Sequence, residues 1–555
     1  MKRWSWVLAA CMAAAPAFAG DVRFSEIHYA GDDGGPALGA NQYRNPVVAG
    51  FYPDPSAIRV GDDFYLVNST FGYFPGLPVF HSRDLVSWRQ IGNAIDRADQ
   101  INYGEKDELT RGLFAPAISY NQGTFYIANT CFYCDGGNYI ITAKNPAGPW
   151  SDPVWLGFTG IDPSLFFDDN GTAWMLNNDV PQGEMRYDGH RAIWMQQFDI
   201  ANKKMIGPRT VLVDGGADPA SKPEHIEGPH VFKHDGWYYL TAAEGGTGEQ
   251  HAQMVWRSKQ VTGPYEPWPG NPSLTQRDLD PNRPDPITSA GHAQFVKLKD
   301  GSWWAVFLAT RPYRGNEYNL GRETFLLPVS WHDGWPMVLP RGARIPVAVQ
   351  RPDLPTTPRP VPTTGAFEWS EKFTTEKMPL QWMTIHPPKQ AWFKTFADGL
   401  RITPSSTPIG GHGSGGQPAY LAHRLQHHRA TITATLDPSS IDSGALAGLV
   451  LLQNERNHYV VAVENDERGL AVVVLQRTGE RSPIAGQEFK RIALPATTKP
   501  VSLRFELDGP RLNVYYAVDS DQWQAIATNL DASLLSAAIA GGFIGNTFGP
   551  YALRR

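Results

Sequence analysis

Three acidic residues stand at the start of similar short sequence elements. Asp54 and Asp162 each open an Asp-Pro-Ser triplet, and Glu227 opens a Glu-Gly-Pro-His sequence. Hydrolysis of an acetal needs an acid that protonates the leaving oxygen and a carboxylate that activates water or attacks directly. These two groups need different pKa values, and a third carboxylate nearby raises the pKa of the acid. Three such acids at one point would supply all of these parts.

The acids belong to a repeat that predicts how they are positioned. Five elements open at Asp54, Ala115, Asp162, Glu227 and His292, at steps of 61, 47, 65 and 65 residues, and each leads into an apolar stretch and a hairpin signal. A recurring unit of this size predicts one blade of a β-propeller per repeat. Equivalent positions of radial blades converge on one axis, so we expect the three acids to meet there.

The alternative for any single acid is a structural turn, because Asp before Pro is common in loops. For Asp54 alone this would be the better interpretation. The repeats differ, however, in that Ala115 and His292 replace an acid. Identical blades would indicate a structural turn, so these differences favour an enzyme.

Composition limits the classes of partner. The chain has 555 residues, of which 42% are hydrophobic, 12% aromatic and 19% charged, and its net charge is −6. The low charge argues against a nucleic-acid partner or an anionic membrane surface. No segment after the N-terminus has the run of about 20 apolar residues that a membrane-spanning helix needs. A neutral, stackable ligand such as a sugar suits the many aromatic residues, although buried aromatic residues would give the same count.

The N-terminus resembles a secretory signal. A basic start is followed by an apolar run and the cleavage pattern Ala17-Phe18-Ala19. We therefore expect residues 1–19 to be removed and the mature protein to be exported to the periplasm or the medium. A lipoprotein attached at Cys11 is the less favoured alternative, because the apolar run before Cys11 is short and continues beyond it.

The pattern along the chain predicts an all-β protein of two domains. Residues 20–44 read as an irregular lead-in, and residues 45–344 as short strands separated by turns, which form the five-bladed propeller. Residues 345–366 are rich in Pro and Thr and read as a surface linker. In residues 367–555 apolar and polar positions alternate, which predicts an antiparallel β-sandwich of two sheets. We expect the sandwich to brace the propeller rather than to bind glycans independently.

Only Cys131 and Cys134 remain after signal removal. In an oxidising compartment they form either a disulfide or two free thiols, and the sequence does not decide between these states. A zinc site would need two more ligands at suitable spacing, which the surrounding sequence lacks.

Eight motifs, in order along the chain, resemble those of glycoside hydrolase family 43. They include FYPDPS, GLFAPAISY, GIDPSLFFDDNG, IEGPHVFKHDGWYYL, AEGGTGEQHA and LGRETFLLPVSWHDGWP, and the resemblance resumes near the C-terminus in GGFIGNTFGPYA. The similar branch contains β-xylosidases and α-L-arabinofuranosidases with a C-terminal sandwich, so the resemblance implies that the sandwich is concanavalin A-like. The family fold is a five-bladed propeller, which agrees with the repeat count.

The resemblance implies a role for each acid. Asp54 would be the general base, Glu227 the general acid, and Asp162 the residue that tunes the pKa of the acid and orients it. The family inverts the anomeric centre, which requires the base and acid carboxyls to stand roughly 6.5–9.5 Å apart. No cofactor would be required, and the substrate would be a xylo- or arabino-oligosaccharide.

Two further roles rest on the resemblance. Arg322 matches an arginine that binds substrate hydroxyls, and His292 matches an axial histidine that contacts substrate or helps hold a calcium ion on the propeller axis through water. Without the resemblance, an ion pair with Glu323 or another acid would be the better interpretation for Arg322. His292 would then be an ordinary buried histidine.

Phe51, Phe71 and Tyr73 would form an apolar wall for a sugar face, although propeller aromatics more often pack in the core. The chain departs from the family at Gly72-Tyr73, where relatives often carry Glu-Trp, and in the insert from Cys131 to Gly137. Both departures are expected at the entrance of the pocket, where they would change substrate preference.

Other functions stay open on the sequence alone. An arabinan-active or other pentosan-active propeller hydrolase fits the same acids. A retaining, sucrose-cleaving propeller opens on an Asn-Asp-Pro-Asn type motif, which differs from Tyr52-Pro53-Asp54-Pro55-Ser56. A non-catalytic glycan-binding propeller would not need three axial acids. Oligomeric state and the choice between xylose and arabinose do not follow from the sequence.

Overall fold

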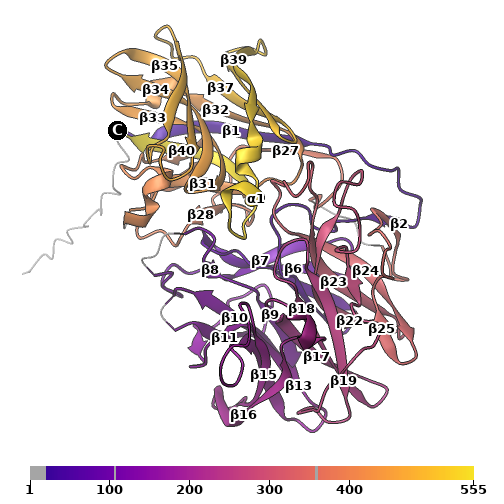
Figure 1. Ribbon diagram of the computed structural model, residues 1–555. Coiled ribbons are helices and arrows are strands. Elements are labelled where there is room, and N and C mark those ends of the chain that lie inside the picture. The colour runs from indigo at the N-terminus through magenta and orange to yellow at the C-terminus, as the bar shows by residue number, and fades with distance from the viewer. Residues whose placement is uncertain (1–19, 105–107, 135, 357–360, 415) are drawn as a thin grey trace, which may run out of the picture.

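The computed structural model describes residues 20–104, 108–134, 136–356, 361–414 and 416–555. Figure 1 shows two all-β bodies, a propeller in purple to pink and a sandwich in orange to yellow. The predicted five-bladed propeller and C-terminal sandwich are both confirmed. No helix among the described residues is long and apolar enough to cross a membrane.

Each blade is an antiparallel sheet of hairpins. The first contains β3 (Ser56–Val60), β4 (Asp63–Val67), β6 (Gly76–Ser82) and β7 (Arg89–Ile95). The second contains β8 (Gly112–Leu113), β9 (Ala117–Asn121), β10 (Thr124–Phe132), β11 (Asn138–Ala143) and β12 (Val154–Trp155). The third contains β13 (Ile161–Phe167), β14 (Ala173–Asp179), β15 (Ala192–Asp199) and β16 (Lys204–Asp214).

The fourth blade contains β17 (Glu227–His234), β18 (Trp237–Glu244), β19 (Ala252–Ser258), β20 (Glu266–Pro267) and β21 (Leu274–Thr275). The fifth contains β22 (Thr288–Lys297), β23 (Trp303–Thr310), β24 (Glu323–His332) and β25 (Trp335–Met337). The innermost strands β3, β9, β13, β17 and β22 contact one another in this order, and β22 returns to β3. This contact closes the ring, so that the opening residue of each repeat lies close to the axis.

The sandwich consists of two sheets. One has the order β29-β30-β1-β32-β37-β38-β39, with β27 also paired to β1, and the other has the order β36-β35-β34-β33-β40-β31-β28-β5. The strands of the first sheet are β1 (Val22–Gly31), β27 (Phe367–Glu371), β29 (Phe393–Phe396), β30 (Gly399–Ile402), β32 (Arg429–Asp437), β37 (Val501–Asp508), β38 (Arg511–Val518) and β39 (Gln524–Asp531). Those of the second are β5 (Tyr73–Phe74), β28 (Met383–Ile385), β31 (Ala419–Arg424), β33 (Ala445–Asn454), β34 (Asn457–Asp466), β35 (Gly469–Thr478), β36 (Gln487–Ala493) and β40 (Thr547–Arg554).

The remaining elements are short. They are β2 (Gln42–Arg44), β26 (Ala348–Gln350), α1 (Ala537–Ala540), and the 3-10 turns η1 (Pro219–Ser221), η2 (Ile409–Ser414), η3 (Pro438–Ser440) and η4 (Ala532–Leu535). β2 pairs with β26, which joins the N-terminal segment to the Pro-rich linker.

The sequence suggested that residues 20–44 form an irregular lead-in, but the structure shows that this segment contains the long strand β1. β1 crosses the sandwich as an indigo strand in Figure 1 and pairs with β27, β30 and β32. Val22, Phe24, Ile27 and Tyr29 are buried in the sandwich core. A register shift between Phe24 and Glu26 breaks the simple alternation of apolar residues, which hides the strand in the sequence.

The propeller sequence also contributes a strand to the sandwich. β5 lies in the propeller sequence but pairs with β28 of the sandwich, with Tyr73 opposite Ile385. At this point the interface between propeller and sandwich is a β-sheet in which β5 forms the edge strand beside β28. The brace that we expected of the sandwich is built by strands of both domains.

Candidate active site

The structure brings the three predicted acids together in one pocket. Asp54 precedes β3 of the first blade, Asp162 lies at the start of β13 and Glu227 begins β17. All three line a small pocket of about 70 Å³, together with His292 and Arg322. Ala115 lines it from the second blade, so every blade contributes the opening residue of its repeat.

Several pocket residues have strained backbones. Asp54, Asp162, His292 and Phe71 have φ angles of 52°, 56°, 50° and 49°, in the left-handed region that L-residues rarely adopt. Such strain clusters at functional sites and is maintained by the surrounding structure. β13, β17 and β22 also carry register shifts at or near these positions. These bulges re-aim side chains at the ends of the strands, here into the pocket.

Asp54 is held by two donors. Arg322 Nη1 donates to Asp54 Oδ1 at 2.7 Å, and Ser69 Oγ donates to Asp54 Oδ2. Glu323, the alternative partner for Arg322, instead accepts from Arg311 Nε at 2.6 Å. Arg322 therefore forms an ion pair, as the alternative interpretation held, but with the predicted general base inside the pocket. Both carboxylate oxygens of Asp54 thus accept hydrogen bonds, and the two donors fix the orientation of the carboxyl in the pocket.

Burial changes the protonation of the other two acids. Burial is the largest cause of a pKa of about 7 for Glu227; the charge of Arg322 lowers this pKa, that of Asp54 raises it and that of Arg191 lowers it. Burial also raises the pKa of Asp162, and the negative charges of Glu227 and Asp54 raise it further. The two carboxyls are coupled, and their repulsion in a buried site favours one shared proton over two charges.

The hydrogen bonds favour Glu227 as the holder of that proton. Gly228 N donates to Asp162 Oδ2 at 3.1 Å, which stabilises a charge on Asp162. Asp162 N in turn donates to Thr130 Oγ1 at 3.1 Å, which fixes the backbone at this point. Among the described residues, none donates a hydrogen bond to the Glu227 carboxyl. The arrangement therefore has one acid available to give a proton and one carboxylate beside it.

His292 packs directly on the backbone of the fourth blade. A Cβ added to Gly228 would lie 2.8 Å from the His292 ring, so only glycine allows this contact, and its φ of +59° favours glycine as well. Burial lowers the pKa of His292, which keeps the ring neutral. His292 thus lies on the wall of the pocket, as predicted.

A calcium ion on the axis would need oxygen ligands. The described parts of the chain contain no group of three or more His, Cys, Asp and Glu side chains placed to hold a metal ion. The charged groups that act on His292 are Asp54, which Arg322 already pairs, and Arg322 itself. His292 in turn acts on His230 and His251, which are poor calcium ligands. Direct coordination therefore does not fit these residues. A water-mediated ion stays a prediction, and no step below depends on it.

Of the three aromatic residues expected at a sugar face, the structure places Phe71 alone in the lining of the pocket. Phe71 lines the pocket, whereas Phe51 and Tyr73 are completely buried and do not. Phe51 stacks behind Phe71 at a ring distance of 5.9 Å. Tyr73 is held in β5, where its hydroxyl lies 2.9 Å from Thr547 Oγ1 of the sandwich. Position 73 therefore belongs to the domain interface and not to the pocket entrance, because the β5–β28 pairing draws it inward.

Four further residues of the pocket were not singled out from the sequence: Phe114, Ile161, Thr247 and Phe543. Phe114 and Ile161 directly precede Ala115 and Asp162, so their place in the repeat was a usable signal. Thr247 lies in the AEGGTGEQHA motif and Phe543 in GGFIGNTFGPYA. The presence of Phe543 could not be derived from the repeat, because this residue comes from the other domain.

The sandwich loop that carries Phe543 is fixed on both sides. Phe543 N donates to Thr110 Oγ1 at 2.6 Å, and Gln453 Nε2 donates to Ile544 O at 3.1 Å. Gly321, next to Arg322, packs so closely on Gly545 that an added Cβ would lie 2.8 Å from its Cα. The sandwich is therefore more than a brace, because it supplies part of the pocket wall.

Cys131 and Cys134 are joined by a disulfide. It closes the turn after β10, next to the pocket residue Phe114, whose ring stacks on Phe132 at 4.9 Å. The described turn from Cys131 to Cys134 thus lies beside the pocket, where the sequence had placed this insert.

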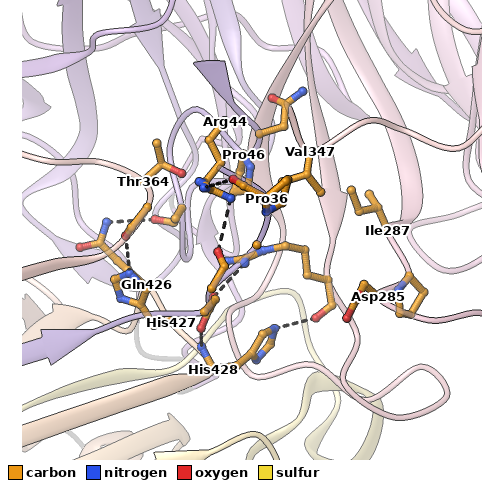
Figure 2. Close-up of a pocket in the computed structure, with 18 of the residues that line it drawn as sticks. Pro36, Arg44, Pro46, Asp285, Ile287, Val347, Thr364, Gln426, His427 and His428 are labelled. Carbon is orange, nitrogen blue, oxygen red and sulfur yellow. Dashed lines mark hydrogen bonds and ion pairs between the residues drawn. The ribbon is translucent and has the colours of Figure 1, made fainter. Parts of the chain in front are cut away.

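A second, larger cavity of about 300 Å³ lies where the N-terminal segment, the fifth blade, the linker and the sandwich meet (Figure 2). Its polar groups largely bind one another. Arg311 Nη1 donates to Asp33 Oδ2 at 2.8 Å, Arg44 Nη2 to Pro36 O at 2.8 Å, and His428 Nε2 lies 2.8 Å from Arg311 O. These contacts join the segments to one another, which makes the cavity a structural junction.

Comparison with known proteins agrees with this geometry. The model of glycosyl hydrolases family 43 matches residues 43–336, and that of the β-xylosidase C-terminal concanavalin A-like domain matches residues 370–555. A xylosidase/arabinosidase of Butyrivibrio fibrisolvens is 36% identical over 524 residues, which cover 92% of this chain and 95% of that protein. The non-reducing end α-L-arabinofuranosidase BoGH43B of Bacteroides ovatus is also 36% identical, over 93% of this chain and 92% of its own.

Among solved structures, a GH43_12 protein retrieved from a capybara gut metagenome has a TM-score of 0.87 at 35% identity, covering 96% of this chain and 99% of that one. The matches span both domains and the whole pocket, including the loop of Phe543. This chain therefore belongs to glycosyl hydrolase family 43 and is a glycoside hydrolase with the family's C-terminal concanavalin A-like domain.

Proposed function

We propose that this chain is an exported, inverting exo-glycosidase that releases β-D-xylosyl or α-L-arabinofuranosyl units from the non-reducing ends of xylan-derived oligosaccharides. One observation carries the proposal: Asp54, Asp162 and Glu227 open into a single small pocket, and Arg322 binds Asp54 within it. The names of the relatives support both sugars, since they include xylosidases and arabinofuranosidases.

The proposed mechanism assigns one role to each acid. Asp54 removes a proton from a water molecule, which attacks the anomeric carbon, and Glu227 gives its proton to the leaving oxygen from the other face of the sugar. In this proposal a negative charge on Asp162 keeps the proton on Glu227 by repulsion, and Gly228 N orients the Asp162 carboxyl. Arg322 positions Asp54 and presents its remaining donors to substrate hydroxyls.

The shape of the pocket favours attack at a chain end. Its volume of about 70 Å³ suits one sugar unit better than a continuous chain, and Phe543 closes one wall from the sandwich side. An endo-acting enzyme would instead need an open groove through the site. The exo-acting mode therefore fits the geometry better than an arabinan-cleaving endo mode.

Export rests on the N-terminal pattern. Residues 1–19 lie outside the described residues, so the proposed signal rests on the sequence alone. Intact-mass measurement of protein recovered outside the cytoplasm should find a mature chain that begins at Gly20. Recovery of the unprocessed chain in the cytoplasm would contradict export.

A substrate panel tests the function. We expect hydrolysis of nitrophenyl β-D-xyloside or α-L-arabinofuranoside and of xylo-oligosaccharides, with the first-formed sugar having the inverted configuration by proton NMR. Retention would contradict the mechanism, and activity on arabinan alone would favour the alternative pentosan hydrolase. A lack of hydrolysis of every pentoside, together with glycan binding, would favour a non-catalytic propeller. Running the panel with and without EDTA tests the predicted calcium ion.

A further inference from the structure

A line of three aromatic rings connects the pocket to the protein surface. Phe114 lines the pocket, Phe132 stacks on it at 4.9 Å with an interplanar angle of 2°, and Tyr133 follows at 4.6 Å from Phe132. Exposure rises along this aromatic track, from 9% for Phe114 to 45% for Tyr133. Most exposed aromatic residues are isolated, so a continuous line that ends in the catalytic pocket calls for an explanation.

The strand register produces the stacked pair. β8 and β10 are antiparallel, with Phe132 opposite Gly112, and Phe114 N donates to Thr130 O at 2.9 Å. Phe114 and Phe132 are therefore diagonal neighbours on one face of the sheet, within reach of one another. Gly112 has no side chain to place between them.

The outer end of the track is covalently fixed. The Cys131–Cys134 disulfide spans Phe132 and Tyr133, and Cys131 N donates to Gly137 O at 2.9 Å. Gly104 packs against this turn so closely that an added Cβ would lie 2.5 Å from Tyr133 O. A ring held in place in this way loses little conformational entropy when a ligand binds to it.

A polar group accompanies the rings. The Arg111 guanidinium lies 5.1 Å from the ring centre of Phe132 and 5.3 Å from that of Tyr133, and its Nε donates to Glu108 Oε2 at 2.9 Å. Aromatic faces with donors and acceptors at their edge match a sugar, which has apolar C–H faces and equatorial hydroxyls. Packing of the disulfide turn alone would not require Tyr133 to be nearly half exposed.

We propose that the aromatic track is the binding subsite for the sugar on the leaving-group side of the cleaved bond. The proposal rests on the proposed function, because the track has this meaning only if Glu227 protonates a glycosidic oxygen in the adjoining pocket. The terminal pentose occupies the pocket, and the next pentose stacks on Phe132 and Tyr133 while Arg111 and Glu108 bind its hydroxyls. The turn from Cys131 to Cys134 then selects oligosaccharides over substrates with small leaving groups.

Two substrates with the same terminal sugar but different leaving groups test the proposal. One is the disaccharide of the pentose that the wild type prefers, and the other is the glycosyl fluoride of that pentose, whose leaving group is one atom. For Tyr133→Ala and Phe132→Leu we expect kcat/KM to fall roughly five- to tenfold on the disaccharide, which is the range of one stacking contact. On the fluoride it should change less than about twofold.

Tyr120→Ala is the matched control. Tyr120 is 38% exposed in the same blade, contacts Phe125 at 4.8 Å and does not line the pocket. We expect wild-type kinetics on both substrates and thermal unfolding close to that of Tyr133→Ala.

The outcomes separate this proposal from the proposed function. A wild type that cleaves both substrates, with Tyr133→Ala unchanged or equally impaired on both, overturns the subsite and leaves the function intact. A wild type that cleaves neither substrate overturns both proposals. A selective loss on the disaccharide supports the subsite.

Discussion

Arg322 Nη1 lies 2.7 Å from Asp54 Oδ1, and both side chains are almost fully buried. Breaking a buried pair by removing one partner leaves an uncompensated charge, which costs about 3–5 kcal/mol. The same contact fixes the orientation of the proposed base. Stability and catalysis therefore depend on one interaction.

Replacement of Arg322 should reduce both the stability of the protein and its catalytic activity. For Arg322→Met we expect kcat/KM to fall by roughly 100-fold or more and the urea midpoint to decrease, because Asp54 loses its cation. Arg322→Lys should restore stability better than activity, since lysine keeps the charge but not the planar fork. Arg314→Met is the control, because Arg314 pairs with Glu317 on the surface and should contribute less than about 1 kcal/mol. Equal losses for Arg322→Met and Arg314→Met would contradict this account.

The basic limb of the pH profile should report Glu227. Burial raises its pKa to about 7, so the acid carries its proton below that pH and loses it above. We expect kcat/KM to fall about tenfold per pH unit above this value. Arg191 lowers the pKa of Glu227, and Arg191→Met should therefore move the limb to higher pH. A limb that stays in place in this variant, or moves to lower pH, would contradict the assignment.

The raised pKa of Glu227 also predicts a cost in stability. Near pH 4 and below, Glu227 is protonated in both the folded and the unfolded chain, so its substitution by an uncharged residue should matter little. As the pH rises from about 4.5 to about 7, the unfolded chain releases a proton that the folded chain retains, and wild-type stability decreases. Glu227→Gln should thus have the higher urea midpoint at pH 8, and the difference should vanish near pH 4. A less stable Glu227→Gln at pH 8 would be inconsistent with a buried, raised carboxyl.

Phe543 should link the sandwich to catalysis. For Phe543→Ala we expect kcat/KM to fall about tenfold, because one wall of the pocket opens to water while the loop stays bound through Thr110 and Ile544. Phe543→Leu keeps apolar volume and should recover part of the loss. Wild-type kinetics in Phe543→Ala would show that the sandwich acts as a brace only.

The sequence predicted the elements of the fold better than their partners. Five hairpin repeats identified the blades, since each blade is local in sequence. The pairing of β1 with β32 joins Tyr29 to Ile432, and no local pattern reports a contact across some 400 residues. The same holds for β5, whose pairing with β28 places Tyr73 in the interface.

The candidate site likewise contains residues that the sequence repeat predicted and features that depend on tertiary contacts. Asp54, Asp162, Glu227 and His292 occupy equivalent places in a repeat, and this equivalence was sufficient to bring them to one axis. The left-handed backbone at three of these residues was not predicted, because tertiary contacts impose it. Phe543 was not predicted as a pocket residue, because it reaches the pocket from the sandwich domain.

The most direct test of the central claim compares substrates that differ only in leaving-group acidity. For Glu227→Ala we expect kcat/KM to fall roughly a thousandfold on the disaccharide but less than about tenfold on the 2,4-dinitrophenyl glycoside, whose leaving group needs no proton. For Asp54→Ala, which loses the base, both substrates should lose activity to a similar extent. Equal losses on both substrates for Glu227→Ala, or full activity of Asp54→Ala on the dinitrophenyl glycoside, would contradict the assigned acid and base.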